Sequence, residues 1–171
     1  IGVLIKKDKI ELTPLIHGGK STTIYRSGTP ALPLIVSISK ALRLALDNIG
    51  EKEKYVSELN TYLKDKLKSY EKVKINSNEY SIPHILNISI IGVKPETMLH
   101  ALEEYGIYIS TKSACSKRDT ESIVVYKLTH DKERSNSSIR ISLSHITTKG
   151  EIDEFIKYFD VCYKKLTTLK D

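Results

Sequence analysis

Residues 137–144 read Ser-Ser-Ile-Arg-Ile-Ser-Leu-Ser, and apolar and polar side chains alternate from Ile139 to Ser144. Successive side chains of a strand point to opposite faces of a sheet, so this alternation predicts a strand with one buried face. Downstream, Thr148 and Glu151 have the spacing of a capping box, which predicts the start of a helix. That helix would bury a stripe of apolar side chains: Ile152, Phe155, Ile156, Phe159 and Leu166. The end of the chain is therefore predicted to be a half-buried strand followed by an amphipathic helix.

The residues upstream of this strand predict further short strands and helices. Strands are predicted at residues 73–75, 84–90 and 107–109. A helix is predicted between Pro95, which suits a first helical turn, and Gly106, which suits the position after a helix end. It would turn Met98, Leu99, Leu102 and Tyr105 inward. Residues 123–128 fit a helix or a strand on pattern alone. The predicted fold class beyond residue 70 is α+β, with an antiparallel or mixed sheet and helices packed on one face.

The N-terminal part of the sequence has a different organisation. Residues 1–7 are predicted to form a buried strand, Asp8 and Lys9 a turn, and residues 10–16 a second extended segment. Residues 20–30 have no apolar period and are rich in hydroxyl groups, which predicts a loop.

An apolar helix is predicted from Pro33 to about Asn48, and we expect Gly50 to kink or end it. One face of that helix carries Leu34, Ile38, Leu42 and Ala45. A second helical period follows, with Val56, Leu59, Leu63, Leu67 and Tyr70 on one face. Helices in series can carry a chain from one domain to the next, so a domain boundary is predicted near residues 48–70.

The composition excludes several classes of protein. The chain has 171 residues, 40% of them hydrophobic and 28% charged, with a formal net charge of +6. This is a globular composition, so a disordered, collagen-like or disulfide-scaffold protein is not expected. No apolar run approaches the roughly 18–20 residues that a membrane span needs. Most lysines alternate with acidic residues, which favours a solvated surface over direct nucleic-acid binding.

The two cysteines and the first residues add expectations about location and length. No spacing around Cys115 and Cys162 resembles a disulfide pattern or a zinc site, which suits a cytoplasmic protein. The sequence begins with apolar residues before any charge and without Met, so we expect it to be a piece of a longer chain.

The two cysteines have contrasting surroundings. Cys115 lies among small residues, with Lys112, Lys117 and Arg118 close by in sequence. Positive charge lowers a thiol pKa, so Cys115 fits either an exposed nucleophile or an incidental surface cysteine. Cys162 falls on the apolar stripe of the last predicted helix and is interpreted as a small core residue.

Two further segments could bind anions. Arg140 alternates with Ile139 and Ile141, so it points away from the buried face, where it could bind a carboxylate or simply face solvent. The segment Arg26-Ser27-Gly28-Thr29-Pro30 precedes a helix and could bind a phosphate, although the same residues are ordinary helix-capping composition.

Taken together, these segments resemble the NifS-like cysteine desulfurases of the class V aminotransferase group. Residues 110–116, Ser-Thr-Lys-Ser-Ala-Cys-Ser, resemble the active-cysteine loop of that family, and residues 137–144 resemble its substrate-arginine strand. Residues 14–19, Pro-Leu-Ile-His-Gly-Gly, and residues 26–30 resemble its glycine-rich loop and its Arg-Ser-Gly-Thr motif. Residues 86–89, Leu-Asn-Ile-Ser, resemble its first small-domain strand. The four matches occur in the order that the family has.

The resemblance implies a fold and an activity. The fold would be the C-terminal small domain of a fold-type I PLP-dependent transferase. Residues 1–30 would end the large pyridoxal-phosphate-binding domain, residues 31–70 would link the domains, and residues 71–171 would form the small domain. The activity would be removal of sulfur from L-cysteine, giving L-alanine and a persulfide for iron–sulfur cluster assembly or tRNA thiolation.

The resemblance also implies roles for individual residues. Cys115 would carry the persulfide, Arg140 would bind the substrate carboxylate, and Thr29 would contact the cofactor phosphate of the other subunit of a homodimer. A sulfur-acceptor protein, either an iron–sulfur scaffold or a tRNA-thiolation enzyme, would be the partner.

The sequence departs from the family in two places. Lys20, Ser21, Thr22 and Thr23 stand where the family has a third glycine and a Gln-Glu or His-Glu pair. The Ser-x-His-Lys motif that carries the Schiff-base lysine is absent, because no His directly precedes a Lys. We therefore expect a C-terminal portion of the enzyme that is inactive alone.

Other functions fit parts of the same pattern. One is a selenocysteine lyase or another class V aminotransferase, and an aminotransferase would not need Cys115. Another is a non-catalytic sulfur-carrier or interaction module.

Overall fold

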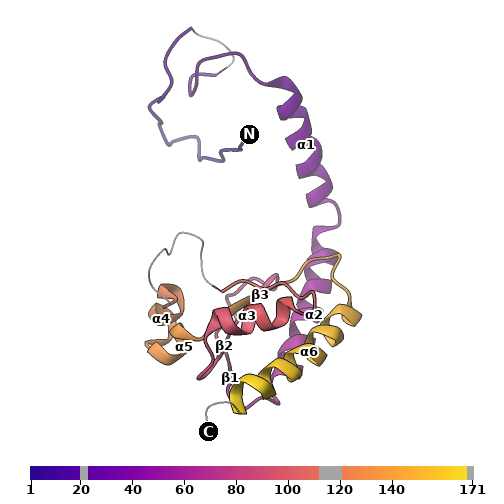
Figure 1. The fold of residues 1–171 in the computed structure, drawn as a ribbon. Coiled ribbons are helices and arrows are strands. Elements are labelled where there is room, and N and C mark those ends of the chain that lie inside the picture. Colours follow the sequence, from indigo (N-terminus) through magenta and orange to yellow (C-terminus); the bar gives the residue numbers. More distant parts are fainter. Residues whose placement is uncertain (20–22, 112–120, 169–171) are drawn as a thin grey trace. The chain divides into compact units, whose positions relative to one another are not determined.

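The computed structural model describes residues 1–19, 23–111 and 121–168. The chain divides into two compact units, Ile1–Ile49 and Gly50–Asp171 (Figure 1). The division falls at the N-terminal end of the range in which the helical pattern predicts a domain boundary.

In the first unit, helix α1 spans Leu32–Leu46. Pro33 lies in its first turn, where a missing N–H costs no hydrogen bond. The helix begins and ends close to the predicted limits. The expected break at Gly50 was wrong by two residues, because the chain turns at Asn48, with a φ of 52°. Asparagine tolerates this left-handed conformation better than most residues, and Gly50 lies inside the first turn of the next helix.

The predicted buried strand at residues 1–7 was wrong. The described residues 1–19 contain no strand, and Ile5 is 91% exposed. A strand needs a neighbouring backbone to pair with, and the described part of this unit supplies none. Residues 10–16 likewise form no strand, although Ile16 O accepts a 3.2 Å hydrogen bond from Ser27 N. The turn at Asp8 and Lys9 is confirmed by a 3.0 Å hydrogen bond from Ile10 N to Lys7 O.

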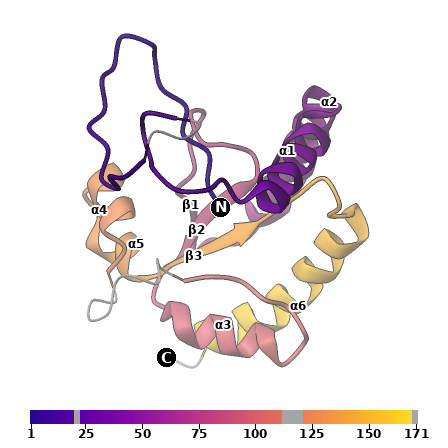
Figure 2. The same cartoon turned by 90° about the horizontal axis from the view of Figure 1, so that it is seen from above.

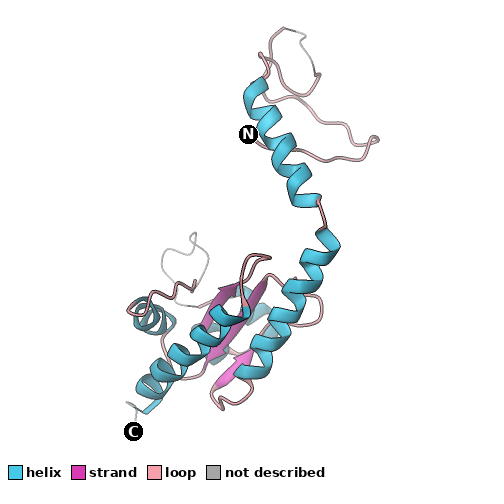
Figure 3. Ribbon diagram, turned by 90° about the vertical axis from the view of Figure 1, so that its right-hand side faces the viewer, coloured by secondary structure: helices cyan, strands magenta, loops and turns pink. Residues whose placement is uncertain are grey.

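The second unit is built on an antiparallel sheet of three strands in the order β1-β2-β3. These strands are Val73–Ile75, Ile85–Ile90 and Ser138–Ser142. The helices are α2 (Ile49–Leu67), α3 (Pro95–Glu103), α4 (Ile123–Thr129), α5 (Lys132–Asn136) and α6 (Lys149–Thr168). Helices α2 and α6 lie on the same face of the sheet (Figure 3). The predicted α+β fold class is confirmed. The expectation that the helices pack on one face was wrong, because α4 and α5 lie on the other side of the strands (Figure 2).

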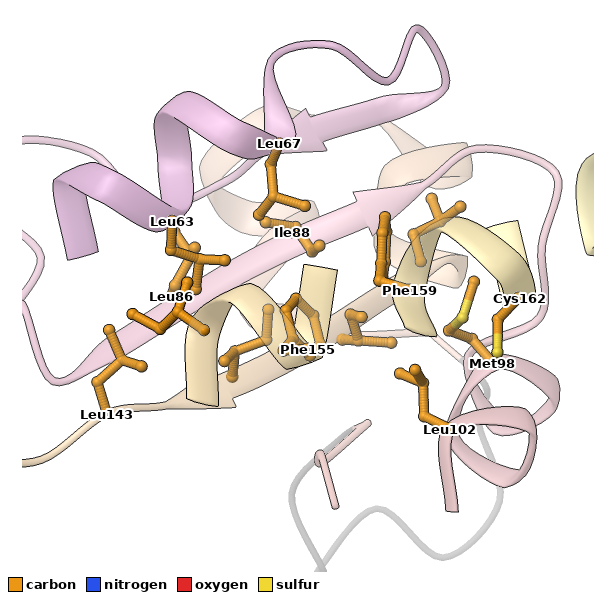
Figure 4. Close-up of a cluster of buried hydrophobic side chains, with 14 of the residues drawn as sticks. Leu63, Leu67, Leu86, Ile88, Met98, Leu102, Leu143, Phe155, Phe159 and Cys162 are labelled. Atoms are coloured by element: carbon orange, nitrogen blue, oxygen red, sulfur yellow. The ribbon is translucent and has the colours of Figure 1, made fainter. Parts of the chain in front are cut away.

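The core lies between one face of the sheet and helices α2, α3 and α6 (Figure 4). The sheet contributes Leu86, Ile88, Ile90, Ile139 and Ile141, and the helices contribute Val56, Leu59, Leu63, Leu67, Met98, Leu102, Ile152, Phe155, Phe159 and Cys162. The predicted inward faces of α2 and α6 are therefore confirmed. Tyr105 was wrongly predicted to face inward, because α3 ends at Glu103 and Tyr105 instead stacks on Tyr158 near the surface.

The structure also tests the predictions for residues 107–109 and 123–128. Residues 107–109 do not form a strand, since this stretch pairs with the sheet only through a single bridge between Ser110 and Arg140. Residues 123–128, which fitted either structure, are helical. The Ser122 side chain accepts a hydrogen bond from Val125 N and so caps α4 at its start, which favours the helix despite its β-branched residues.

The predicted capping box at the start of α6 is confirmed. Thr148 N donates to Glu151 Oε2 at 2.7 Å, and Glu151 N donates to Thr148 Oγ1 at 3.2 Å. The pKa of the Glu151 carboxyl is lowered because its Oε2 accepts hydrogen bonds from Thr148 N and, at 3.0 Å, from Thr148 Oγ1. Among the described helices, none combines the length and the apolar character needed to cross a bilayer.

Candidate functional site

The sheet has a polar face opposite its core. Leu86, Ile88 and Ile90 of β2 point into the core, so the intervening Asn87 and Ser89 point the other way. In the same way Arg140 of β3 lies between the buried Ile139 and Ile141. Arg140 thus lies on the outward face that its alternation predicts.

Arg140 and Asn87 are direct cross-strand partners on this polar face. Both backbone groups of Arg140 bond to Ser110: Arg140 N donates to Ser110 O at 2.6 Å, and Ser110 N donates to Arg140 O at 3.0 Å. Since a strand residue points its N–H and C=O to the same side, Arg140 and Asn87 form a non-hydrogen-bonded pair. In such pairs the side chains come closer together than in hydrogen-bonded pairs.

A cavity of about 370 Å³ opens on the polar face. One part of its wall is polar and includes Asn76, Asn87, Thr111 and Arg140. The remainder is largely apolar and comes from Ile82, Ile85, Val124, Val125 and Leu128. Arg140 is the charged residue among the described residues that line this cavity, so the cavity favours an anion with an apolar portion.

Arg134 of α5 holds the polar wall in place by hydrogen bonds to one of its residues, Asn76. Its guanidinium donates to Asn76 Oδ1 and to the carbonyl of Ile75 at the end of β1. Asn76 in turn donates to Asn87 Oδ1 at 2.7 Å. Figure 2 shows α4 and α5 on one side of the strands and α2 and α6 on the other. The sequence pattern did not predict site roles for Asn76, Asn87 or Arg134, although alternation in β2 places Asn87 on the face of Arg140.

The candidate nucleophile Cys115 lies outside the described residues. Among the described residues, Thr111 before that segment and Ser122 after it both line the cavity. The structure therefore brings both neighbours of the Cys115 segment to the cavity that Arg140 lines.

Cys162 is buried, as its position on the apolar stripe predicts. It is 3% exposed, and its Sγ donates to the carbonyl of Ala101 at 3.5 Å. Burial raises the pKa of the Cys162 thiol, and the charge of Glu104 adds to the effect. A thiol in this state is a poor nucleophile.

The third predicted site residue, Thr29, lies in the first unit. Its side chain is exposed in the loop before α1. The neighbouring Gly28 has a φ of +109°, and a Cβ there would lie 3.5 Å from Arg26 Nη1. This loop thus combines a glycine conformation, an exposed hydroxyl and a nearby guanidinium, which together fit a phosphate group. Arg140 belongs to the second unit, Gly50–Asp171.

The described residues contain no group of three His, Cys, Asp or Glu side chains that could hold a metal ion.

Comparisons with known proteins place these features in a family. A family model described as aminotransferase class-V matches residues 1–155. A protein of Lactobacillus delbrueckii subsp. bulgaricus, named NifS/IcsS protein homolog, is 37% identical over 177 residues, which cover 99% of this chain and 45% of that protein. Cysteine desulfurase IscS of Buchnera aphidicola subsp. Baizongia pistaciae is 35% identical, with 96% of this chain and 41% of that protein covered.

Solved structures agree with these sequence relatives. A NifS-like protein from Rickettsia africae has a TM-score of 0.75 at 32% identity, covering 91% of this chain and 41% of its own. Another structure, titled NifS-like protein, has a TM-score of 0.79 at 29% identity, covering 93% and 41%. The chain spans about two fifths of the length of these relatives. The family match extends over most of the sequence, and the chain belongs to the aminotransferase class-V family.

Proposed function

We propose that the protein containing this chain is a pyridoxal-phosphate-dependent cysteine desulfurase. It would convert L-cysteine to L-alanine and leave the sulfur as a persulfide on Cys115. The observation that carries the proposal is the cavity of the second unit, which is lined by Arg140 and by residues on both sides of the Cys115 segment. The names of the relatives, cysteine desulfurase IscS among them, support the same activity.

Arg140 is proposed to bind the α-carboxylate of cysteine. A guanidinium offers paired donors to the two oxygens of a carboxylate, and Arg140 is the charged residue among the described cavity residues. The apolar part of the wall would exclude water from the bound amino acid and strengthen this ionic contact.

Cys115 is proposed to be the nucleophile. Its thiolate would attack the sulfur of the substrate, forming a sulfur–sulfur bond as the carbon–sulfur bond breaks. The electron pair of the broken bond would remain on the β-carbon, which takes up a proton and leaves as alanine. When bound, pyridoxal phosphate supplies the electron sink for the carbon skeleton.

Thr29 is proposed to contact the cofactor phosphate, with Arg26 adding positive charge to the same loop. We further propose that this contact reaches the cofactor of the other subunit of a homodimer. No His is directly followed by a Lys within the 171 residues, so the Schiff-base lysine is proposed to lie outside them and the chain alone to be inactive.

The sulfur is proposed to pass to an acceptor protein, either an iron–sulfur scaffold or a tRNA-thiolation enzyme. The spacing of the two cysteines suggests no disulfide framework, which suits a reducing compartment, and the enzyme is proposed to act in the cytoplasm.

The test is to give the complete enzyme L-cysteine without an acceptor and to measure alanine and protein-bound persulfide. Arg140→Ala should raise KM for cysteine by about ten- to a hundred-fold, since a hydrogen bond to a charged group contributes roughly 1.5–3 kcal/mol. Cys115→Ser should abolish the persulfide, whereas Cys162→Ala serves as the matched thiol control and should retain it. A persulfide on Cys162, or alanine formation that survives loss of Cys115, would refute the proposed mechanism; a thiol-independent transamination would indicate an aminotransferase.

A further inference from the structure

The orientation of the Asn76 side-chain amide is fixed by its neighbours. Asn76 is 5% exposed, and its Oδ1 accepts hydrogen bonds from Arg134 Nε at 2.9 Å and from Arg134 Nη2 at 2.7 Å. A guanidinium donates hydrogen bonds and accepts none. The atom of Asn76 that faces Arg134 must therefore be the oxygen, and the amide nitrogen must face the opposite way.

The nitrogen of Asn76 is used completely. Asn76 Nδ2 donates to Asn87 Oδ1 at 2.7 Å and to Ser89 Oγ at 2.7 Å, which accounts for both of its hydrogens. Ser89 Oγ passes its own hydrogen to the carbonyl of Arg134 at 2.7 Å. Both hydrogens of Asn76 Nδ2, its Oδ1 and the hydroxyl of Ser89 thus all have hydrogen-bond partners.

This arrangement fixes Asn87 as well. Because Asn87 Oδ1 accepts from Asn76, the Asn87 amide nitrogen is the end of the side chain left for the cavity that Asn87 lines. Arg140 is its cross-strand partner in a non-hydrogen-bonded pair, so the two side chains lie close together on one wall. That wall presents an N–H₂ group beside a guanidinium.

We propose that Asn87 Nδ2 is a second donor to the substrate carboxylate, beside Arg140, and that Arg134 is a positioning residue that sets the orientation of both asparagine amides. This inference rests on the proposed function, since the ligand is then the α-carboxylate of cysteine. It adds to the activity a chain of hydrogen bonds from α5 through Asn76 to the substrate.

Replacing Asn76 by the isosteric Asp should reverse the orientation of the Asn87 amide. In the Asn76→Asp variant the second oxygen faces Asn87 and has no hydrogen to donate. Asn87 must then turn its nitrogen toward position 76 and its oxygen toward the cavity, where it repels a carboxylate. The variant keeps its shape and gains an ion pair with Arg134, so folding should be retained.

The first measurement is steady-state kinetics with L-cysteine in the complete enzyme. Asn87→Ala, Asn76→Asp and Arg134→Gln should each raise KM about tenfold, with kcat close to wild type, because each removes or reverses one donor to the carboxylate. Lys132→Gln is the matched control, since it removes a positive charge from α5 outside the network, and its KM should be unchanged. Melting temperatures identify any variant whose KM changes through loss of fold.

The second measurement needs no turnover and uses NMR of the ¹⁵N-labelled chain titrated with sodium acetate, with sodium chloride as the reference salt. The Asn87 side-chain N–H₂ and Arg140 Nε–H signals should shift together with acetate, and the Asn87 response should disappear in Asn76→Asp. If the complete enzyme makes no alanine while the acetate shifts are present, the proposed function fails and the carboxylate site stands. The inference is overturned by one combination of results in an active wild-type enzyme. In that combination the KM of Asn87→Ala is unchanged, and acetate does not shift the Asn87 side-chain signal.

Discussion

The two cysteines should differ in reactivity by orders of magnitude in the folded protein. The test is to add a thiol-alkylating reagent to the native chain and to follow the labelling of each cysteine by mass spectrometry. Cys115 lies among small and cationic residues that favour the reactive thiolate. Cys162 is buried between α6 and α3, and burial raises its pKa.

The size of the difference follows from what must open to expose Cys162. Lifting α6 away from the core would expose Ile152, Phe155 and Phe159, which are all buried. Burial of a large apolar side chain stabilises the fold by at least about 1.5 kcal/mol, so exposing three of them costs at least about 4.5 kcal/mol. Because 1.4 kcal/mol corresponds to a factor of ten, Cys162 should react at least about a thousandfold more slowly than Cys115.

The control is the same reaction in concentrated guanidinium chloride, where both thiols should react at similar rates. A Cys162→Ala variant should show unchanged labelling of Cys115. Equal labelling of the two thiols in native buffer would refute the packing of α6 against α3 and, with it, the assignment of Cys162 to the core.

Three further measurements test other parts of the structure. Phe159→Ala should lower the free energy of unfolding by about 3–5 kcal/mol, because Phe159 is fully buried and packs against Tyr70. Urea titration followed by circular dichroism measures this loss, and a loss below about 1 kcal/mol would contradict the packing. The stability that Glu151 contributes should be present above its ordinary pKa of 4.5 and lost as the pH falls through the lowered pKa of the folded state, so wild type and Glu151→Ala should converge in melting temperature in acid. Failure to converge would exclude the capping carboxylate as the cause. Borohydride treatment of the chain with pyridoxal phosphate should label no single lysine stoichiometrically, and peptide mapping that finds one such lysine would contradict the proposed location of the Schiff-base lysine.

Local patterns were sufficient for much of the fold. The alternation around Arg140 and the capping box at Thr148 and Glu151 predicted β3 and the start of α6, because both signals depend on neighbouring residues. The same local reasoning failed for residues 1–7 and 107–109. These segments have the composition of strands, but a strand also requires a backbone partner, which periodicity does not reveal.

The candidate site shows a similar limit. Alternation predicted that Arg140 faces away from the core, whereas the wall in which it lies depends on contacts between distant residues. Arg134 reaches Asn76 across 58 positions of sequence, and no spacing pattern connects them. The carboxylate-binding role of Arg140, the phosphate-binding role of Thr29 and the nucleophilic role of Cys115 all stay predictions.

The double hydrogen bond between Ser110 and Arg140 has a consequence for the entropy of binding. Fixing the backbone of a residue costs about 1–2 kcal/mol, and for Arg140 this loss is incurred when the sheet forms. If a carboxylate binds Arg140 as proposed, only the torsions of the arginine side chain are left for it to immobilise. The same pair of bonds makes Ser110, and with it the start of the segment that leads to Cys115, part of the rigid frame of β3. A displacement of that strand would carry Arg140 and Ser110 together, and would preserve the register between them.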